Sequence, residues 1–382
     1  MKVPLGRGPI GSGSTAGADP HASSTVRWKR GSRRKGSLGE GGNAAAARGE
    51  RRRPRWWGDM APAQNTEGGF MSALSGKAVV VTGSGSGLGA AYARHAASLG
   101  ANVVVNDIDV GKAEQTAAAI RDAGGSALAH AGDVARWETA QILIDLCVSE
   151  FGTLSGFVTN AGVLHHGRIM DSIERDLRRM FEINLLGTAA CASAAAKAML
   201  AQGTGGSIVT VTSGSQAGDI ALGGYGATKA AVAALTYSWA MELSGTAVRI
   251  NAISPLAETA MAAQHKAHPA VRQANREIQS DILPDPEVSA PVISYLLSDG
   301  ARDIHGQVVR IAGRQLSFVS HPMIADPILE GAWTFEAVID AFEKHLRHRQ
   351  HKLGLSYAWP SGPERSGRGR SGTGTRRLHG RA

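Results

Sequence analysis

Short apolar runs alternate with longer helix-forming segments from Lys77 to about residue 348. The short runs hold five or six residues, mostly apolar, as buried strands do, whereas the longer segments exceed ten residues and are rich in Ala and Leu, which favours helices. This alternation predicts a parallel sheet covered by helices on both faces. The expected strands are 78–82, 103–107, 126–130, 155–159, 207–212, 247–252 and 307–312. The expected helices are 87–99, 111–123, 136–151, 174–201, 225–243, 287–298 and 334–348. The sequence therefore predicts one α/β domain with a doubly wound, seven-stranded parallel sheet.

Charge divides the chain into three parts. Lys and Arg exceed Asp and Glu by eight in residues 1–70 and by nine in residues 344–382, whereas Asp and Glu exceed Lys and Arg by eight in residues 71–343. Both ends are also rich in Gly, Ser, Pro and Arg, a composition that cannot bury enough apolar surface to fold. We therefore expect disordered basic extensions at 1–70 and 351–382 around a domain at 71–350.

Location is indicated by what the sequence lacks. No apolar run approaches the ~20 residues of a membrane span, and the N-terminus has no apolar core of a secretory signal. The two cysteines, Cys147 and Cys191, have neither the spacing nor the neighbours of a zinc site. Two buried thiols are typical of a reducing compartment. The sequence predicts a cytoplasmic protein with no metal site and no membrane partner.

The stretch Thr82-Gly-Ser-Gly-Ser-Gly-Leu-Gly89 lies between an expected strand and an expected helix. Glycines let a backbone approach a pyrophosphate closely, and the free N–H groups at the start of the helix attract the anion. A tight connection without a ligand is the alternative. The expected cofactor contacts in this stretch are Gly83, Ser86, Gly87, Leu88 and Gly89.

The second expected strand ends at Asp107, 18 residues after Gly89. In dinucleotide-binding folds a carboxylate at this place accepts hydrogen bonds from the ribose hydroxyls and repels the 2′-phosphate of NADP. Neither Arg nor Lys occurs at 84–88 or 108–111 to hold that phosphate. The sequence therefore favours NAD as the cofactor, and an exposed loop acid is the alternative interpretation of Asp107.

Tyr225 and Lys229 begin an expected helix and lie four residues apart, which places them on one helical face. A cation near a phenol favours the phenolate and lowers a pKa that is otherwise near 10. Tyr225 is therefore a candidate general acid/base. Ser213, at the end of the preceding strand, and Asn184 are candidates to complete the catalytic site, with Ser215 as a second candidate for the catalytic hydroxyl.

The motifs T-G-x-x-x-G-x-G and Y-x-x-x-K, at this separation, resemble those of the short-chain dehydrogenase/reductase family from roughly Gly76 to Gly313. The resemblance implies a Rossmann-type domain in which Tyr225 exchanges a proton with the substrate and Ser213 hydrogen-bonds the substrate oxygen. It implies that Lys229 lowers the tyrosine pKa and binds the nicotinamide ribose, and that Asn184 holds a water in a proton relay. Relatives are commonly tetramers, so a homotetramer is expected.

The same resemblance assigns further cofactor contacts. Asp133 and Val134 follow the third strand, where relatives contact the adenine, and Asn160 flanks the cofactor after the fourth strand. Thr259 is expected to contact the nicotinamide amide. Tyr225 and Lys229 count among the cofactor contacts as well as the catalytic residues.

Three stretches depart from the family pattern. Thr159 replaces the first Asn of N-N-A-G, Ser254-Pro-Leu256 replaces the usual Pro-Gly, and the last strand does not end in Gly-Gly. The region after Leu256 is expected to close over the substrate, as the equivalent region does in this fold. His165 and His166 are expected to be solvated loop residues.

The expected function is that of an NAD-dependent short-chain dehydrogenase/reductase. It would interconvert a small-molecule secondary alcohol and a ketone, with a 3-hydroxyacyl or 3-oxoacyl thioester as one substrate class. Hydride transfer to the cofactor requires the protein to supply a proton and an oxygen-binding pocket. A catalytically weak NAD-binding protein and a nucleic-acid binder through the basic ends are the alternatives. The intact catalytic residues favour turnover, and a nucleic-acid partner is disfavoured.

Overall fold

The computed structural model describes residues 73–273, 283–351 and 353–355. The predicted extension at 1–70 lies outside the described residues, as does most of the one at 351–382. By their contacts the described residues form two compact units, one of residues 73–323 with 351 and 353–355, and one of residues 324–350. Residues 324–350 thus pack among themselves, although the predicted domain at 71–350 includes them.

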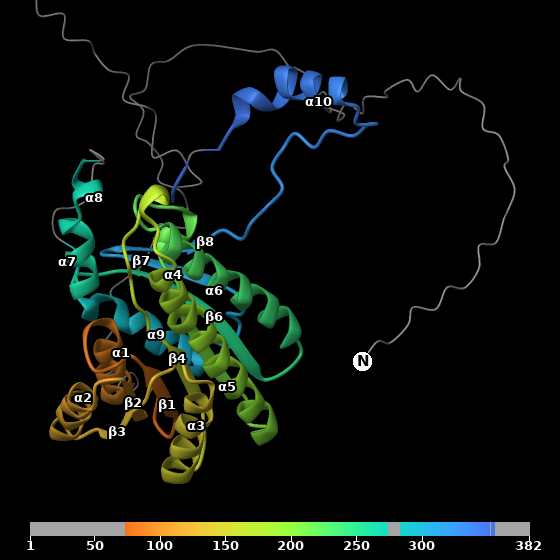
Figure 1. Cartoon of the computed structure of the whole chain (residues 1–382). Coiled ribbons are helices and arrows are strands. Elements are labelled where there is room, and N and C mark those ends of the chain that lie inside the picture. The colour runs from red at the N-terminus through yellow and green to blue at the C-terminus, as the bar shows by residue number, and fades with distance from the viewer. Residues whose placement is uncertain (1–72, 274–282, 352, 356–382) are drawn as a thin grey trace, which may run out of the picture. The chain divides into compact units, whose positions relative to one another are not determined.

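The larger unit is built on a sheet with the strand order β3-β2-β1-β4-β5-β6-β7-β8 (Figure 1). The parallel strands are β1 (Ala78–Thr82), β2 (Asn102–Asp107), β3 (Ser126–Ala131), β4 (Gly156–Thr159), β5 (Gly206–Val211), β6 (Val248–Leu256) and β7 (Val308–Ala312). The direction of winding reverses between β1 and β4, where Val81 lies opposite both Val105 of β2 and Val158 of β4. Ligands of such sheets bind outside the carboxyl ends of the strands at this reversal. The α/β doubly wound fold is confirmed.

An eighth strand corrects the predicted seven-stranded parallel sheet. β8 (Gln315–Val319) pairs antiparallel with β7, with Ile311 opposite Leu316. Gly313, at φ +57°, lies in the two-residue turn between the two strands. Because the turn returns the chain directly, the sheet gains an antiparallel edge without a crossover helix.

Two hydrophobic cores fill the two faces of the sheet. Val79 and Val81 of β1 belong to a core with α1 (Gly87–Ser98), α2 (Val110–Asp122) and α9 (Ala290–Leu297). Val80, between them, belongs to the opposite core with α3 (Trp137–Phe151), α5 (Thr188–Gln202) and α6 (Gly223–Glu242). Successive strand residues point to opposite faces, so a strand covered on both sides is apolar at every position. This explains why all five residues of β1 are buried.

The helix predicted at 174–201 is continuous but changes type. α4 (Glu174–Met180) passes into a π-helical segment, Phe181–Gly187, and then into α5. Among the described residues, Glu174–Gln202 is the one helix long and apolar enough to cross a membrane, and half of its most apolar window is buried. Its apolar composition is explained by the packing of α5 on the sheet. The π-helical segment contains Asn184, and such segments frequently mark functional sites.

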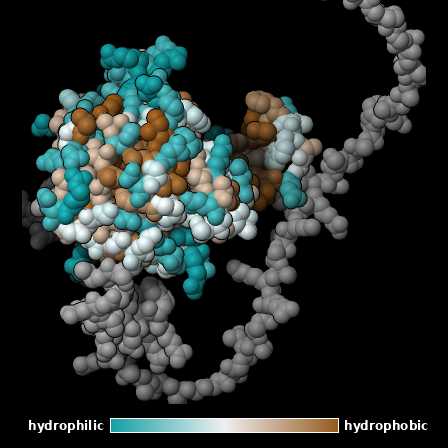
Figure 2. All heavy atoms as spheres, turned by 90° about the horizontal axis from the view of Figure 1, so that it is seen from below, coloured by the Kyte–Doolittle hydropathy of each residue, from teal (hydrophilic) through white to brown (hydrophobic). Residues whose placement is uncertain are grey.

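Two further helices, α7 (Ala260–Ala267) and α8 (Pro269–Gln273), lie in the region expected to cover the substrate, and we call them the lid helices. The smaller unit contains α10 (Phe335–Ala341). Apolar side chains of this smaller unit line a cavity of about 270 Å³. Some hydrophobic surface of the unit is also exposed (Figure 2). The cavity residues are Pro327, Leu329, Trp333, Val338, Ala341, Phe342 and Leu346.

Gly89 is where the packing of the larger unit is least tolerant of a side chain. A Cβ atom there would lie 2.3 Å from the carbonyl oxygen of Gly83 and 2.5 Å from Nδ2 of Asn160. Gly89→Ala is therefore expected to lower the free energy of unfolding by about 1–3 kcal/mol, the usual cost of overpacking. Gly223→Ala is the matched control because a Cβ there would meet nothing within 4 Å. Urea denaturation of both variants measures the difference, and equal stabilities would contradict this description of the turn.

Candidate active site

The glycine-rich turn presents the start of α1 at the carboxyl ends of β1 and β4. Gly83 and Gly87 have positive φ angles of +60° and +55°, a conformation that side chains rarely adopt. Ser86 is the N-cap of α1, and its side chain makes no capping hydrogen bond. The first N–H groups of the helix, on Gly87, Leu88 and Gly89, are therefore available to an anion, and the helix dipole favours negative charge there. The predicted pyrophosphate contacts are brought together.

Asp107 holds this turn from the end of β2. Its carboxylate accepts hydrogen bonds from the backbone N–H of Gly85 at 3.0 Å and of Asp109 at 3.1 Å. Lys112, which the sequence analysis did not consider, lies beside Asp107. Both residues line the space next to Gly85, because a Cβ on Gly85 would be 2.7 Å from Cβ of Lys112 and 2.9 Å from Cγ of Asp107. The Lys112 ammonium lies 3.7 Å from Asp109. The cofactor end of the site thus has both an acid and a nearby cation.

Asn160 fastens the end of β4 to the turn. Its Nδ2 donates to the carbonyls of Thr82 and Gly83, at 3.0 and 2.9 Å. The Thr82 hydroxyl accepts from the backbone N–H groups of Asn160 and Ala161. Asn160 therefore positions the floor of the cofactor crevice. The neighbouring Thr159, which replaces an Asn of the family pattern, has a buried hydroxyl without a hydrogen-bond partner.

Tyr225 and Ser213 meet at the carboxyl end of β5. Ser213 follows the strand, and its side chain lies close enough to the Tyr225 hydroxyl to lower the pKa of that group. Ser213 Oγ also accepts from the backbone N–H of Ser215 at 3.2 Å, and the two serine hydroxyls are 3.4 Å apart. Ser213 is therefore the hydroxyl that faces Tyr225, with Ser215 as its neighbour.

Burial controls the acidity of this cluster. It raises the pKa of Tyr225 to about 12, and the nearby Ser213 side chain acts in the opposite direction. Burial also lowers the pKa of Lys229 to about 8. Desolvation of the phenolate is the largest influence on the tyrosine pKa in the protein by itself, and the expected lowering by Lys229 stays a prediction. At neutral pH Tyr225 carries its proton and is ready to donate it.

Lys229 and Asn184 support the tyrosine from behind. Lys229 Nζ lies 5.7 Å from the centroid of the Tyr225 ring and donates to the carbonyl of Val211 at 2.8 Å. The Asn184 side chain bonds both the N–H and the C=O of Val163, and its Nδ2 also donates to Thr228 Oγ1 at 3.1 Å. The Asn184 side chain is thus committed to joining the helices, which makes it a positioning residue.

The remaining predicted cofactor residues are found at two places. Asp133 caps the turn before α3 through the N–H of Ala135 and forms an ion pair with Arg179 at 3.2 Å. Val134, next to it, is buried. Thr259 caps α7 by accepting from Ala262 N–H at 3.1 Å. Its methyl carbon lies 3.8 Å from where a Cβ of Gly87 would be, so Thr259 faces the glycine-rich turn.

Apolar residues surround the substrate side of Tyr225. Tyr225 packs with buried Met180 and Leu222, and partly buried residues complete this cluster: Val163, Leu164, Leu177 and Met261. Met261 belongs to the lid helix α7. The reacting oxygen would therefore meet polar hydroxyls while the rest of the substrate meets hydrocarbon.

Stacked histidines join the lid helices to the loop after β4. The His166 ring stacks on His268 with centroids 4.5 Å apart and on His265 with centroids 5.3 Å apart. His166 Nε2 lies 3.1 Å from His265 Nδ1. The expectation that His166 is a solvated loop residue is wrong, because its ring is held between the loop and the lid. No signal in the sequence pairs residues a hundred positions apart.

Free backbone N–H groups at the start of α1, together with the cluster of Tyr225, Ser213 and Lys229 beyond β5, match the pattern of an oxidoreductase site. The family model described as "short chain dehydrogenase" matches residues 77–270, and the chain belongs to this family. The chain is 37% identical over 244 residues to a cis-4-hydroxycyclohexanecarboxylate dehydrogenase of Sinomonas cyclohexanicum, covering 63% of this chain and 97% of that protein. It is 35% identical to a hydroxyacyl-CoA dehydrogenase of Mycobacterium tuberculosis, covering 65% of this chain and 81% of that protein.

A solved structure agrees with these comparisons. A short chain dehydrogenase from Mycobacterium avium has a TM-score of 0.65 and 29% identity, with 75% of this chain and all of that chain covered. The protein is therefore an oxidoreductase that acts on CH–OH groups, and its family uses nicotinamide cofactors.

The histidine stack predicts a pH dependence of the lid. Burial and the nearby His268, His265 and His165 lower the pKa of His166 to about 4. Because this is below the ordinary value near 6.5, the stack is stable above about pH 6.5 and is weakened as the pH falls toward 4. Amides of α7 are expected to exchange hydrogen faster over that range, after correction for intrinsic rates. His166→Asn should remove most of this pH dependence, and an unchanged dependence would show that another group is responsible.

Proposed function

We propose that the protein is an NAD-dependent oxidoreductase that interconverts a secondary alcohol and a ketone, with Tyr225 as the general acid/base. The grouping of Ser213, Tyr225 and Lys229, with the Lys229 ammonium 5.7 Å from the centre of the Tyr225 ring, carries this proposal. The nicotinamide, when bound, supplies a hydride acceptor or donor. The start of α1, Asp107 and Asn160 would hold the dinucleotide. The glycine-rich backbone at the start of α1 fits a pyrophosphate, because no side chains separate that backbone from the phosphate groups.

The chain's own residues handle the oxygen and its proton. The hydroxyls of Ser213 and Tyr225 both face the substrate side, so together they can hold the carbonyl or alcohol oxygen. In reduction, the phenol of Tyr225 gives its proton to that oxygen as negative charge develops there. In oxidation, the tyrosine must accept the proton, and a charged Lys229 stabilises the resulting phenolate. Asn184 fixes the helix that carries Tyr225 and Lys229.

The apolar cluster around Tyr225 supports an uncharged hydrocarbon body next to the reacting carbon. A cyclic secondary alcohol, such as the one in the name of the Sinomonas relative, has such a hydrocarbon body. The acyl chain in the name of the Mycobacterium relative has one as well. We therefore propose secondary alcohols on an alicyclic ring or an acyl chain, including 3-hydroxyacyl thioesters, as the substrates to be screened first.

We also propose that the protein assembles as a homo-oligomer through α5 and α6. Leu200 on α5 and Met241 on α6 are large apolar residues that are 46% and 80% exposed. Exposed apolar side chains on neighbouring helices are typical of a covered surface.

Tyr225→Phe tests the assigned proton donor. The substitution keeps the ring and its packing but removes the hydroxyl, so turnover of a responsive alcohol is expected to fall by about 10²–10⁴-fold. The dissociation constant of the cofactor should change little, because the hydroxyl faces Ser213 and the substrate. Steady-state kinetics and fluorescence titration measure the two quantities. Turnover within about threefold of the unmodified protein would exclude Tyr225 as the proton donor.

Asp107→Ala tests the choice of NAD. The carboxylate can accept from ribose hydroxyls and repel a 2′-phosphate, so we expect kcat/KM for NAD to exceed that for NADP by at least about tenfold. Asp107→Ala should remove most of this preference, whereas Lys112→Ala should increase it by removing the nearby cation. Kinetics with both cofactors decide the matter, and equal kcat/KM values in the unmodified protein would refute the assignment.

A further inference from the structure

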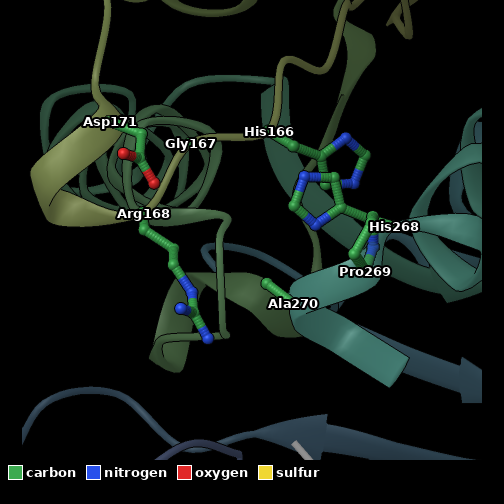
Figure 3. Close-up of a pocket in the computed structure, with 7 residues that line it drawn as sticks. All are labelled: His166, Gly167, Arg168, Asp171, His268, Pro269 and Ala270. Atoms are coloured by element: carbon green, nitrogen blue, oxygen red, sulfur yellow. The ribbon is translucent and has the colours of Figure 1, made fainter. Parts of the chain in front are cut away.

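A cavity opens between the lid helices and the loop after β4, beside the apolar cluster. Its volume is about 250 Å³. His166, Arg168 and Asp171 line it from the loop, and His268 and Ala270 line it from the lid (Figure 3).

Polar groups without partners face this cavity. Within the part of the chain that the structure describes, the side chains of Arg168, Asp171 and His268 make no hydrogen bond or ion pair. Figure 3 shows the Arg168 guanidinium extending away from the Asp171 carboxylate and toward Ala270. Nδ1 of His268 also lacks a hydrogen-bond partner, but it is buried and does not open onto the cavity. Arginines elsewhere on this surface do form pairs, such as Arg178 with Glu174 at 2.7 Å.

The backbone fixes the cavity at a set place relative to Tyr225. Gly167 N–H donates to the carbonyl of Ala221 at 3.0 Å, and Gly167 forms a bridge with Leu222. Leu222 packs against Tyr225, and Arg168 is the next residue after Gly167. Ala221 has a φ of +58°, which for a residue other than glycine indicates a strained, held conformation. The loop is therefore held against the start of the helix that carries Tyr225, and Arg168 follows the bridging residue.

We propose that this cavity is a subsite for a carboxylate on the substrate, bound by the guanidinium of Arg168 with His268 beside it. The proposal rests on the proposed function and narrows it to hydroxy acids, in which an apolar body separates the secondary alcohol at Tyr225 from an acidic tail. A planar carboxylate matches the fork of a guanidinium. Asp171 on the same cavity repels negative charge, which selects a monoanionic carboxylate over a phosphate.

Two substitutions that remove charges of opposite sign from the cavity provide the test. The measured quantity is the ratio of kcat/KM for 4-hydroxycyclohexanecarboxylate to that for its methyl ester, which lacks the charge. Arg168→Gln is expected to lower this ratio by about tenfold or more, the contribution of a charge-assisted hydrogen bond. Asp171→Asn is expected to raise it severalfold. Arg178→Gln is the matched control, since it removes a nearby arginine that already has a partner.

A binding experiment separates this inference from the proposed function. Calorimetry of the full chain with cyclohexanecarboxylate, which has no hydroxyl to oxidise, should give weaker binding to Arg168→Gln and tighter binding to Asp171→Asn. If neither alcohol is oxidised but these shifts occur, the proposed function fails and the carboxylate subsite stands. If the ester is oxidised and the ratio changes by less than twofold in both variants, the subsite is refuted and the proposed function stands. No difference between Arg168→Gln and Arg178→Gln in either experiment would also refute it.

Discussion

The junction of β1 and β4 is the constraint on which the site depends. The sheet winds in opposite directions from this pair of strands, and ligands of such sheets bind outside the carboxyl ends at this point. Asn160 and the Thr82 hydroxyl bond the two strand ends to each other and to the glycine-rich turn. With the turn held in this way, the open start of α1 faces the crevice. A looser junction would leave the cofactor without a fixed position relative to Tyr225.

Burial then sets the chemistry on the other side of the crevice. Tyr225 is 8% exposed and Lys229 is 3% exposed, and burial raises the pKa of the phenol and lowers the pKa of the ammonium. The Val211 carbonyl accepts a hydrogen bond from Lys229 and keeps that side chain in place, and the Ser213 side chain lies near the Tyr225 hydroxyl. A site of this kind holds a protonated phenol at neutral pH with a lysine ammonium near its ring.

The sequence was sufficient for the features that depend on local pattern. Seven strands, the glycine-rich turn and the Tyr225–Lys229 spacing follow from periodicity and motif, and the structure agrees. β8 carried a signal that was missed, because Gly313 precedes a run in which Leu316 and Phe318 alternate with polar residues. The tyrosine pKa, the Lys112 neighbour of Asp107 and the His166 stack depend on burial and on contacts between distant segments. One sequence without an alignment holds no record of such contacts.

Transfer of deuterium from substrate to cofactor tests the central claim most directly. The full chain would be incubated with oxidised NAD and a secondary alcohol, such as 4-hydroxycyclohexanecarboxylate, that carries deuterium on the carbinol carbon. If the protein removes a hydride from that carbon while Tyr225 takes the hydroxyl proton, mass spectrometry should find one deuterium in the reduced cofactor and none in the solvent. Reduced cofactor without deuterium, or deuterium in the water, would contradict this account of the site.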